Sequence, residues 1–198
     1  MSVAGIILAA GESRRMGFPK ALLRYRDETF LDTLIGLFAA RCRPVIVVLG
    51  AHNDRIRERT IRPATFVINP DYQRGQTSSM QCGLRAVPPD AEGVLFTLVD
   101  HPAVAPATLE ALLAGLGPQA CDPRPLVRVP RHAGHRGHPI WFSRDLIAEF
   151  LALPENGAAR EIVRSHGAQT EFLDVDDAGI LADIDDAAAY GRLTGATL

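Results

Sequence analysis

The stretch LAAGESRRMGFPK, residues 8–20, follows an apolar run at 3–8 and combines two glycines with three cations, Arg14, Arg15 and Lys20. An apolar run that is rich in β-branched residues and lacks alternation predicts a buried strand. Glycines after a strand let the backbone approach an anion closely and turn its N–H groups toward it. Because the three cations lie within seven residues, the loop favours phosphate binding over a plain surface turn.

Two common phosphate-binding templates do not describe this loop. A Walker loop places its lysine directly after a glycine and before a serine or threonine, whereas two residues separate Gly17 from Lys20. A dinucleotide fingerprint has glycines at its first, third and sixth positions, whereas the next glycine after Gly11 is Gly17. Phosphate binding here would therefore use a different arrangement.

The rest of the chain alternates between strand-like and helix-like segments. Further apolar runs lie at 44–49, 65–68 and 93–99, and apolar stripes at helical spacing span 31–38 and 109–116. Such alternation predicts an α/β fold, a Rossmann-like three-layer α/β/α arrangement with a mostly parallel mixed sheet. Ligands then bind at the carboxyl ends of the strands, where the loop at 8–20 begins.

The later part of the chain continues one domain. The stretch GPQACDPRPL, residues 117–126, contains three prolines and predicts a loop, not a linker between domains. A length of 198 residues and a hydrophobic content of 47% also suit one globular unit with a sizeable core. After the loop we expect an apolar stretch at 126–129, a strand at 138–142, two short helices near 146–151 and 159–163, a strand at 171–175 and a helix from about 186.

Composition limits the partners and the compartment. A net charge of -2, from 21 basic and 23 acidic residues, favours neither nucleic acid nor an anionic membrane as a partner. The cysteines Cys42, Cys82 and Cys121 show no paired metal-ligand spacing and no disulfide framework, which suits a reducing cytosol. No basic segment followed by an apolar stretch opens the chain, and no apolar run approaches the ~20 residues that span a bilayer. We therefore expect a cytoplasmic protein.

Five stretches stand out in order along the chain: LAAGESRRMGFPK (8–20), NPDYQRGQTSSMQCGL (69–84), LVDHP (98–102), GHRGHPIWF (134–142) and GILADID (179–185). Together they closely resemble the MobA-like nucleotidyltransferases, the molybdenum cofactor nucleotidyltransferase family. The LAAG start is more similar to the cytidylyltransferase branch than to the guanylyltransferase branch. This resemblance implies a fold of the nucleotide-diphospho-sugar transferase type, with a nucleotide-binding part at about 1–105 and an acceptor-binding part at about 106–198.

The reaction that the resemblance implies is transfer of CMP from CTP to the phosphate of molybdopterin cofactor, with release of pyrophosphate. In such a transfer, the protein mostly positions the reactants and neutralises charge. Lys20 would act at the α-phosphate, and Arg14 with Arg15 would hold the β and γ groups. A solvated basic turn is the alternative for these cations, although Pro19 stiffens the chain before Lys20 and so favours a positioned lysine.

Carboxylates that could bind Mg²⁺ come from two places. Asp100 follows an apolar strand, so its side chain should emerge at the carboxyl edge of the sheet. A turn or helix cap is an equally good explanation by position alone, and the resemblance favours a metal ligand. We expect the second ligand to be Asp183, with Asp185 as the alternative. Asp185 or Asp186 would also suit the N-cap of the final helix.

The stretch at 69–80 predicts a loop that leads into a helix, with hydroxyl side chains at 77–79 placed to cap it. By resemblance, Asn69, Gly75 and Ser79 would face the base and the ribose. The full set of expected nucleotide-binding residues is Leu8, Ala9, Ala10, Gly11, Lys20, Asn69, Gly75 and Ser79.

The stretch RHAGHRGHP, residues 131–139, spaces three histidines at intervals of three. Its glycines and proline make a regular helix unfavourable, so the imidazoles need not share a face, and a zinc site is the weaker interpretation. The resemblance places the loop beside the acceptor, with Arg136, Gly137 and His138 as its binding residues. His138 could equally be a structural hydrogen-bonding residue beneath that loop.

Two rival functions remain at this level. One is a nucleotidyltransferase of the same fold that acts on another phosphorylated acceptor, such as a sugar phosphate. The other is a non-catalytic accessory protein that binds nucleotide or cofactor and delivers it to a molybdoenzyme. The tail DDAAAY supports the second rival, because it departs from the Thr, Pro, Glu and Asp that the family commonly carries there. The expected partners are therefore NTP and a molybdopterin-type acceptor, together with a molybdoenzyme or its maturation factor.

Overall fold

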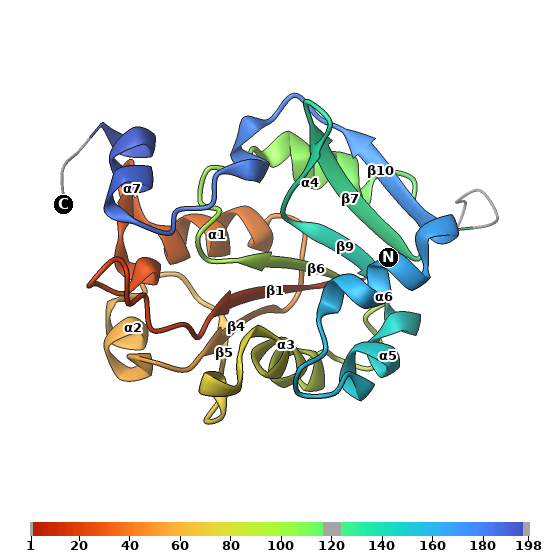
Figure 1. Cartoon of the computed structure of the whole chain (residues 1–198), viewed down its shortest axis with the longest axis horizontal. Helices are drawn as coiled ribbons and strands as arrows, with labels where there is room; N and C mark the ends of the chain where they lie inside the picture. Colours follow the sequence, from red (N-terminus) through yellow and green to blue (C-terminus); the bar gives the residue numbers. More distant parts are fainter. Residues whose placement is uncertain (1, 117–123, 196–198) are drawn as a thin grey trace.

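The computed structural model describes residues 2–116 and 124–195. It has a central sheet with helices on both faces (Figure 1). The sheet runs in the order β10-β7-β9-β6-β1-β4-β5, and β8 pairs with β7. Its strands are β1 (Val3–Ala9), β4 (Val45–Leu49), β5 (Thr65–Ile68), β6 (Gly93–Leu98), β7 (Val127–His132), β8 (His135–Arg136), β9 (Ile140–Ser143) and β10 (Thr170–Asp174).

The sheet is mixed and mostly parallel, which confirms the predicted fold class. Strand β1 pairs in parallel with β4 and β6, β4 with β5, and β10 with β7. Only β8 and β9 run antiparallel to their neighbours in the described part of this sheet. The carboxyl ends of β1, β4 and β6 therefore meet at one edge.

Strand β5 corrects one expectation. Its apolar, non-alternating sequence predicts a fully buried strand, but its residues are half-buried or exposed, and Ile68 is 45% exposed. The reason is its position, because β5 is the last strand of the sheet and has a neighbour on one side only.

Helices cover both faces of the sheet and enclose two apolar cores. One core packs α1, α4 and α7 against the sheet, and the other packs α3, α5 and α6. The helices predicted from apolar spacing are present, although Leu116 lies beyond the end of α4, where it is still buried. The helices are α1 (Phe30–Ala39), α2 (Asn53–Arg59), α3 (Gln76–Arg85), α4 (Pro106–Leu113), α5 (Ile147–Ala152), α6 (Ala159–Ser165) and α7 (Ala187–Thr194).

Short elements complete the described chain. A small hairpin pairs β2 (Arg24–Tyr25) with β3 (Glu28–Thr29) ahead of α1. Single 3₁₀ turns are η1 (Lys20–Leu22), η2 (Tyr72–Arg74), η3 (Arg144–Leu146), η4 (Gly167–Gln169) and η5 (Ala178–Leu181). Most of the loop predicted at 117–126, with Cys121, lies outside the described residues. Among the helices described, none is both long and apolar enough to cross a membrane.

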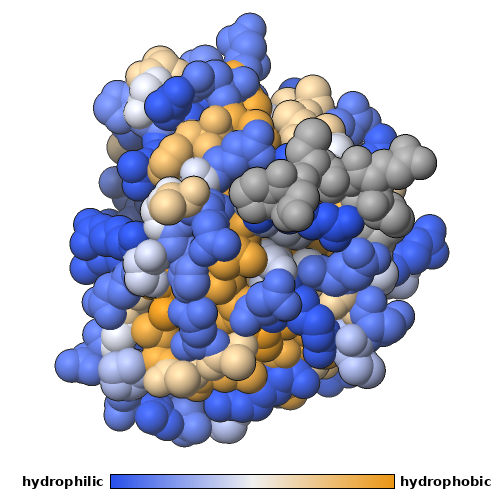
Figure 2. All heavy atoms as spheres, turned by 90° about the vertical axis from the view of Figure 1, so that its right-hand side faces the viewer, coloured by the Kyte–Doolittle hydropathy of each residue, from blue (hydrophilic) through white to orange (hydrophobic). Residues whose placement is uncertain are grey.

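The molecule seen from the right-hand side of Figure 1 has a mostly hydrophilic surface with an apolar strip between the polar side chains (Figure 2). This view faces the end of the sheet near α5, α6 and β10 (Figure 1). The carboxyl ends of β1 and β6 point away from it, toward α7. The strand ends that should carry the functional residues therefore lie at the opposite end of the molecule.

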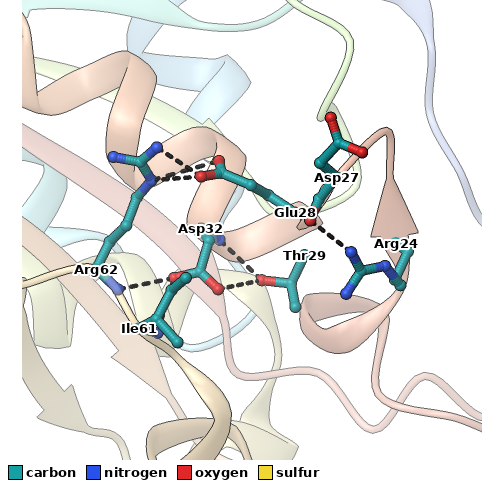
Figure 3. A network of polar contacts seen from close by, with 7 residues as sticks. All are labelled: Arg24, Asp27, Glu28, Thr29, Asp32, Ile61 and Arg62. Atoms are coloured by element: carbon teal, nitrogen blue, oxygen red, sulfur yellow. Dashed lines mark hydrogen bonds and ion pairs between the residues drawn. The ribbon is translucent and has the colours of Figure 1, made fainter.

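A buried aspartate joins α1 to the segment before β5 (Figure 3). Asp32 is 1% exposed, and its Oδ1 accepts hydrogen bonds from the backbone N–H groups of Ile61 at 3.0 Å and Arg62 at 2.9 Å. The Thr29 hydroxyl donates to Asp32 Oδ2 at 2.7 Å and caps the helix by accepting from Asp32 N–H at 3.0 Å. One carboxylate thus satisfies three donors at the start of α1.

Asp32→Asn is expected to lower the free energy of unfolding by about 1–3 kcal/mol, because the amide nitrogen cannot accept and leaves a buried donor unsatisfied. Urea unfolding of the purified variant measures this change. Unchanged stability would show that the network contributes little.

Candidate functional site

A cavity of about 710 Å³ opens where β1 and β6 end. Its floor is made by the last residues of β1 and the residues after it, Leu8 to Gly11, and by the end of β6 with Val99 and Asp100. The glycine-rich loop forms one side and the segment 72–76 another. The position is the one that a parallel sheet predicts, since neighbouring strand ends leave an open crevice.

The glycine-rich loop is shaped by Ser13, to which the sequence reasoning assigned no role. Ser13 has a positive φ of 54°, and its carbonyl accepts from the N–H groups of Met16 at 3.0 Å and Gly17 at 3.1 Å. Its hydroxyl accepts from the Lys20 N–H at 3.0 Å. Met16 is buried under the loop. These contacts fold the loop back so that Lys20 starts η1 beside the cavity.

The two arginines of the loop point to different partners. The Arg14 side chain is 83% exposed and contacts Glu12 within the loop. Arg15 Nη1 lies 2.9 Å from Asp185 Oδ2, although the Arg15 side chain is 73% exposed. Both residues line the cavity. Of the two, Arg15 is therefore the one that reaches across to the C-terminal segment.

Lys20 joins two carboxylates that are far apart in the sequence. Its Nζ lies 3.0 Å from Asp100 Oδ2 and also contacts Asp185 Oδ1. Burial by itself lowers the pKa of Lys20, but the bonds to Asp185 and Asp100 outweigh it and raise the pKa above its usual value. The hydrogen bond from Lys20 lowers the pKa of Asp185 in turn. Lys20 and Asp185 therefore stay charged near neutral pH.

Asp100, Asp183 and Asp185 form an acid cluster that could hold a metal ion. Each can offer one oxygen, and these atoms lie within 4.8 Å of one another. Burial and the charges of Asp100 and Asp185 raise the pKa of Asp183, and Asp100 Oδ1 is buried without a hydrogen-bond partner. Such an oxygen set suits Mg²⁺ or Mn²⁺. Only Asp100 and Asp185 of the three line the cavity.

Two predictions for the C-terminal aspartates have different outcomes. Asp186 is the N-cap of α7, where its side chain accepts from the Ala189 N–H at 2.7 Å, so the capping prediction is confirmed for this residue. The choice between Asp183 and Asp185 as second ligand stays a prediction. Because both belong to the acid cluster, the geometry accommodates either.

The segment 69–79 contains one expected residue that lies behind the cavity and two that line it. Asn69 is buried, and its Nδ2 donates to Ser78 Oγ at 2.8 Å and to Ser79 Oγ at 3.0 Å. Gly75, with a φ of 106°, and Ser79 line the cavity. Asn69 thus holds the segment in shape from behind.

The hydroxyls at 77–79 do not cap α3, so that expectation is wrong. The helix begins at Gln76 with Gly75 as its N-cap and without a side-chain bond at the cap. Thr77 instead donates to the Gly157 carbonyl at 2.7 Å, and Ser78 donates to the Asp71 carbonyl at 2.9 Å. Since α3 starts earlier than the hydroxyls suggest, they lie inside its first turn and bind other segments.

Residues that the sequence reasoning missed also line the cavity. They are Glu12, Ser13, Pro19, Ala21, Ile56, Tyr72, Gln73, Gln76, Leu98 and Val99. Tyr72 is the aromatic side chain among them, and it packs so closely on Gly50 that a Cβ there would lie 2.5 Å from the Tyr72 Cβ. An aromatic residue inside an otherwise polar loop is the signal that could have identified it.

The expected acceptor residues do not line the cavity. Arg136 is exposed and its guanidinium stands 4.3 Å from the centre of the Phe172 ring. The His138 N–H donates to the Ile180 carbonyl at 3.0 Å. Burial, and then the neighbouring His101, lower the pKa of His138 to about 4, so its ring is neutral at pH 7. The acceptor role of Arg136, Gly137 and His138 stays a prediction.

Comparisons with known proteins add a family to this geometry. Residues 5–170 match the model of the MobA-like NTP transferase domain. The molybdenum cofactor cytidylyltransferase of Escherichia coli (strain K12) is 28% identical over 182 residues, which cover 91% of this chain and 89% of that protein. The purine catabolism protein PucB of Bacillus subtilis (strain 168) is 30% identical over 202 residues, which cover 94% and 93%.

Solved structures agree over nearly the full length. The crystal structure of Rv0371c from Mycobacterium tuberculosis H37Rv superposes with a TM-score of 0.85 at 33% identity and covers 99% of this chain and 98% of that one. A structure of Rv0371c in complex with manganese has a TM-score of 0.80 at 31% identity and covers 100% of each chain.

Proposed function

Since this chain belongs to the MobA-like NTP transferase family and is a nucleotidyltransferase, we propose that it transfers CMP from CTP to the phosphate of molybdopterin cofactor. A phosphate oxygen of the acceptor attacks the α-phosphorus of CTP and forms a phosphoanhydride bond. The bond between the α-phosphorus and the bridging oxygen breaks, and pyrophosphate leaves with its electron pair. The observation that carries the proposal is the contact of Lys20 with Asp100 and Asp185 at the edge of the sheet where β1 and β6 end.

The cations would act on the triphosphate. Lys20 is held at the cavity floor by Ser13 and by the two aspartates. Its ammonium would therefore meet the α-phosphate with little reorganisation and neutralise the charge that grows there during transfer. Arg15 and Arg14, on the open side of the loop, would hold the β and γ groups that leave as pyrophosphate.

The acid cluster would hold Mg²⁺ or Mn²⁺, with Asp100 as one ligand and Asp183 or Asp185 as the other. A divalent cation bound there would supply charge neutralisation at the phosphate oxygens. The manganese complex of Rv0371c supports a divalent cation in this fold, and we propose Mg²⁺ as the ion in use.

The nucleoside would lie over the end of β1. The backbone of Leu8 to Gly11 forms the floor there, and Gly75 and Ser79 line the wall opposite. Backbone N–H and C=O groups can read a base edge without a side chain, which suits cytosine recognition by a short LAAG segment. The similarity to a cytidylyltransferase supports CTP as the nucleotide.

We also propose that the two substrates bind to different parts of the chain. Apart from Asp185, the residues that line the cavity fall within 8–100. This supports a nucleotide-binding part at about 1–105 and an acceptor-binding part at about 106–198. Arg136 and His138 would then meet the acceptor from the side of the acid cluster.

A substrate panel tests the function. Pyrophosphate release is measured with CTP, GTP, ATP or UTP, each combined with molybdopterin cofactor or with a sugar phosphate, in Mg²⁺ and in excess EDTA. We expect turnover only with CTP and molybdopterin cofactor in Mg²⁺. Without a cation, the carboxylates of the acid cluster would repel the negatively charged triphosphate. Turnover with a sugar phosphate alone would contradict the acceptor. Binding of CTP without turnover in any mixture would support an accessory protein instead.

A further inference from the structure

A buried aspartate outside the cavity precedes the C-terminal carboxylates. Asp177 is 8% exposed, and its Oδ2 accepts from the Ala105 N–H at 2.8 Å and from the Thr108 hydroxyl at 2.6 Å. Its Oδ1 accepts from the Gly179 N–H at 2.9 Å. Asp177 therefore joins the N-terminus of α4 to the start of η5, two segments that are about seventy residues apart in the chain.

The chain after Asp177 passes between two other backbones. A Cβ on Gly179 would lie 2.2 Å from the Ala103 carbonyl oxygen, and a Cβ on Gly137 would lie 2.3 Å from the Ile180 carbonyl oxygen. Such distances exclude a side chain at either glycine unless the backbones move apart. The segment 177–180 is thus held tightly between the loop after β6 and the loop before β9.

The loop after β6 leads directly to the site. That loop contains Asp100, whose carbonyl accepts from the Ile184 N–H at 3.0 Å. Ile184 lies between Asp183 and Asp185 and is 3% exposed. The C-terminal carboxylates are therefore tied to Asp100 at two points, through Ile184 directly and through Asp177 by way of the loop that ends at α4.

We propose that Asp177 is a positioning residue that sets the separation between Asp100 and the carboxylates of Asp183 and Asp185. The proposal rests on the proposed role of the acid cluster as a metal site. Asp177 lies outside both the cavity and the acid cluster, so its role is to place other residues. A small divalent ion demands near-ideal placement of its oxygen ligands, so a shift of the 177–185 segment weakens its binding.

Asp32 provides a matched control for this role. Like Asp177, Asp32 is a buried carboxylate that accepts two backbone N–H bonds and one threonine hydroxyl at the start of a helix (Figure 3). It joins α1 to the segment before β5 and lines neither the cavity nor the acid cluster. Asp32→Asn and Asp177→Asn therefore change similar interactions, and only Asp177 begins a segment that leads to the acid cluster.

The experiment titrates Mn²⁺ alone into the free proteins and follows the unbound ion by electron paramagnetic resonance. We expect Asp177→Asn to weaken Mn²⁺ binding by roughly 10- to 100-fold, and Asp32→Asn to bind like the unmodified chain. Thr108→Val, which removes one donor to Asp177 and keeps the carboxylate, should give a smaller shift in the same direction. It also keeps the test available if Asp177→Asn does not fold.

The outcomes separate this inference from the proposed function. Equal weakening by Asp32→Asn and Asp177→Asn would assign the effect to general destabilisation and overturn the positioning role. Unchanged Mn²⁺ binding in both Asp177→Asn and Thr108→Val would also overturn it. In either case Asp100→Asn should still abolish Mn²⁺ binding, and that result would still support the acid cluster as the metal site. If Asp100→Asn leaves Mn²⁺ binding unchanged, the metal site of the proposed function fails instead.

Discussion

Lys20→Met is expected to lower kcat for nucleotidyl transfer by roughly 100- to 1,000-fold, with a much smaller change in KM for CTP. Methionine keeps most of the aliphatic length of lysine and removes the charge. The effect falls on kcat because the ammonium, held by Asp100 and Asp185 at the cavity floor, would meet charge that grows mainly in the transition state. Steady-state pyrophosphate release with CTP measures both constants.

A second measurement distinguishes the loss of Lys20 from a loss of fold. In the free protein, the ammonium competes with a metal ion for Asp100 and Asp185, so Lys20→Met should bind Mn²⁺ more tightly while it turns over more slowly. Arg41→Met is the control, since it removes an exposed cation paired with Glu110 away from the cavity. Undiminished turnover in Lys20→Met would contradict the assignment of this residue to the α-phosphate.

Asp100→Asn is expected to reduce turnover by at least roughly 100-fold and to abolish Mn²⁺ binding by the free protein. Asparagine has the same shape, but its amide offers one neutral oxygen in place of a charged pair. It also leaves Lys20 with one carboxylate fewer, although Asp185 still holds the lysine. Raising Mg²⁺ should not restore the rate, because the ligand itself has changed.

The control for Asp100→Asn is Asp90→Asn, an exposed aspartate outside the cavity and the acid cluster. It removes the same charge from the surface and should leave the rate and Mn²⁺ binding as they are. Asp100→Asn with the full rate in Mg²⁺ would show that Asp100 is no metal ligand, and the structural alternative of a turn cap would then be the better explanation.

The central elements of the fold could be predicted from local sequence. Strands β1, β4 and β6 are apolar and non-alternating because both faces are covered, and their observed bounds differ from the predicted ones by one residue at most. Strand β5 has the same kind of sequence and is nevertheless half-exposed. Its neighbours in the sheet decide this, and no local pattern states which strand is the last one.

Many of the residues expected from the sequence line the cavity, but the sequence did not predict how they contact one another. The resemblance implied that Lys20 and Asp100 act on the same triphosphate, and the position of Asp100 after an apolar strand placed it at the edge of the sheet. Their direct contact, and the part that Asp185 takes in it, come from the return of the C-terminal segment to that edge. Ser13 and Asp177 were missed, because a serine or an aspartate in a loop is an ordinary turn signal.

The sequence by itself determined the alternation of strands and helices, the departure of the loop at 8–20 from the Walker and dinucleotide templates, and the resemblance to MobA-like enzymes. These properties depend on periodicity, on spacing and on ordered motifs, which are all local. Only the tertiary structure decided which charges meet. Adjacent parallel strands β1 and β6 bring Lys20 to Asp100, and the bonds of Asp177 and Ile184 bring the C-terminal carboxylates to both. Contacts between distant residues depend on the order of strands and on buried hydrogen bonds. Neither can be predicted from the local pattern of a single sequence.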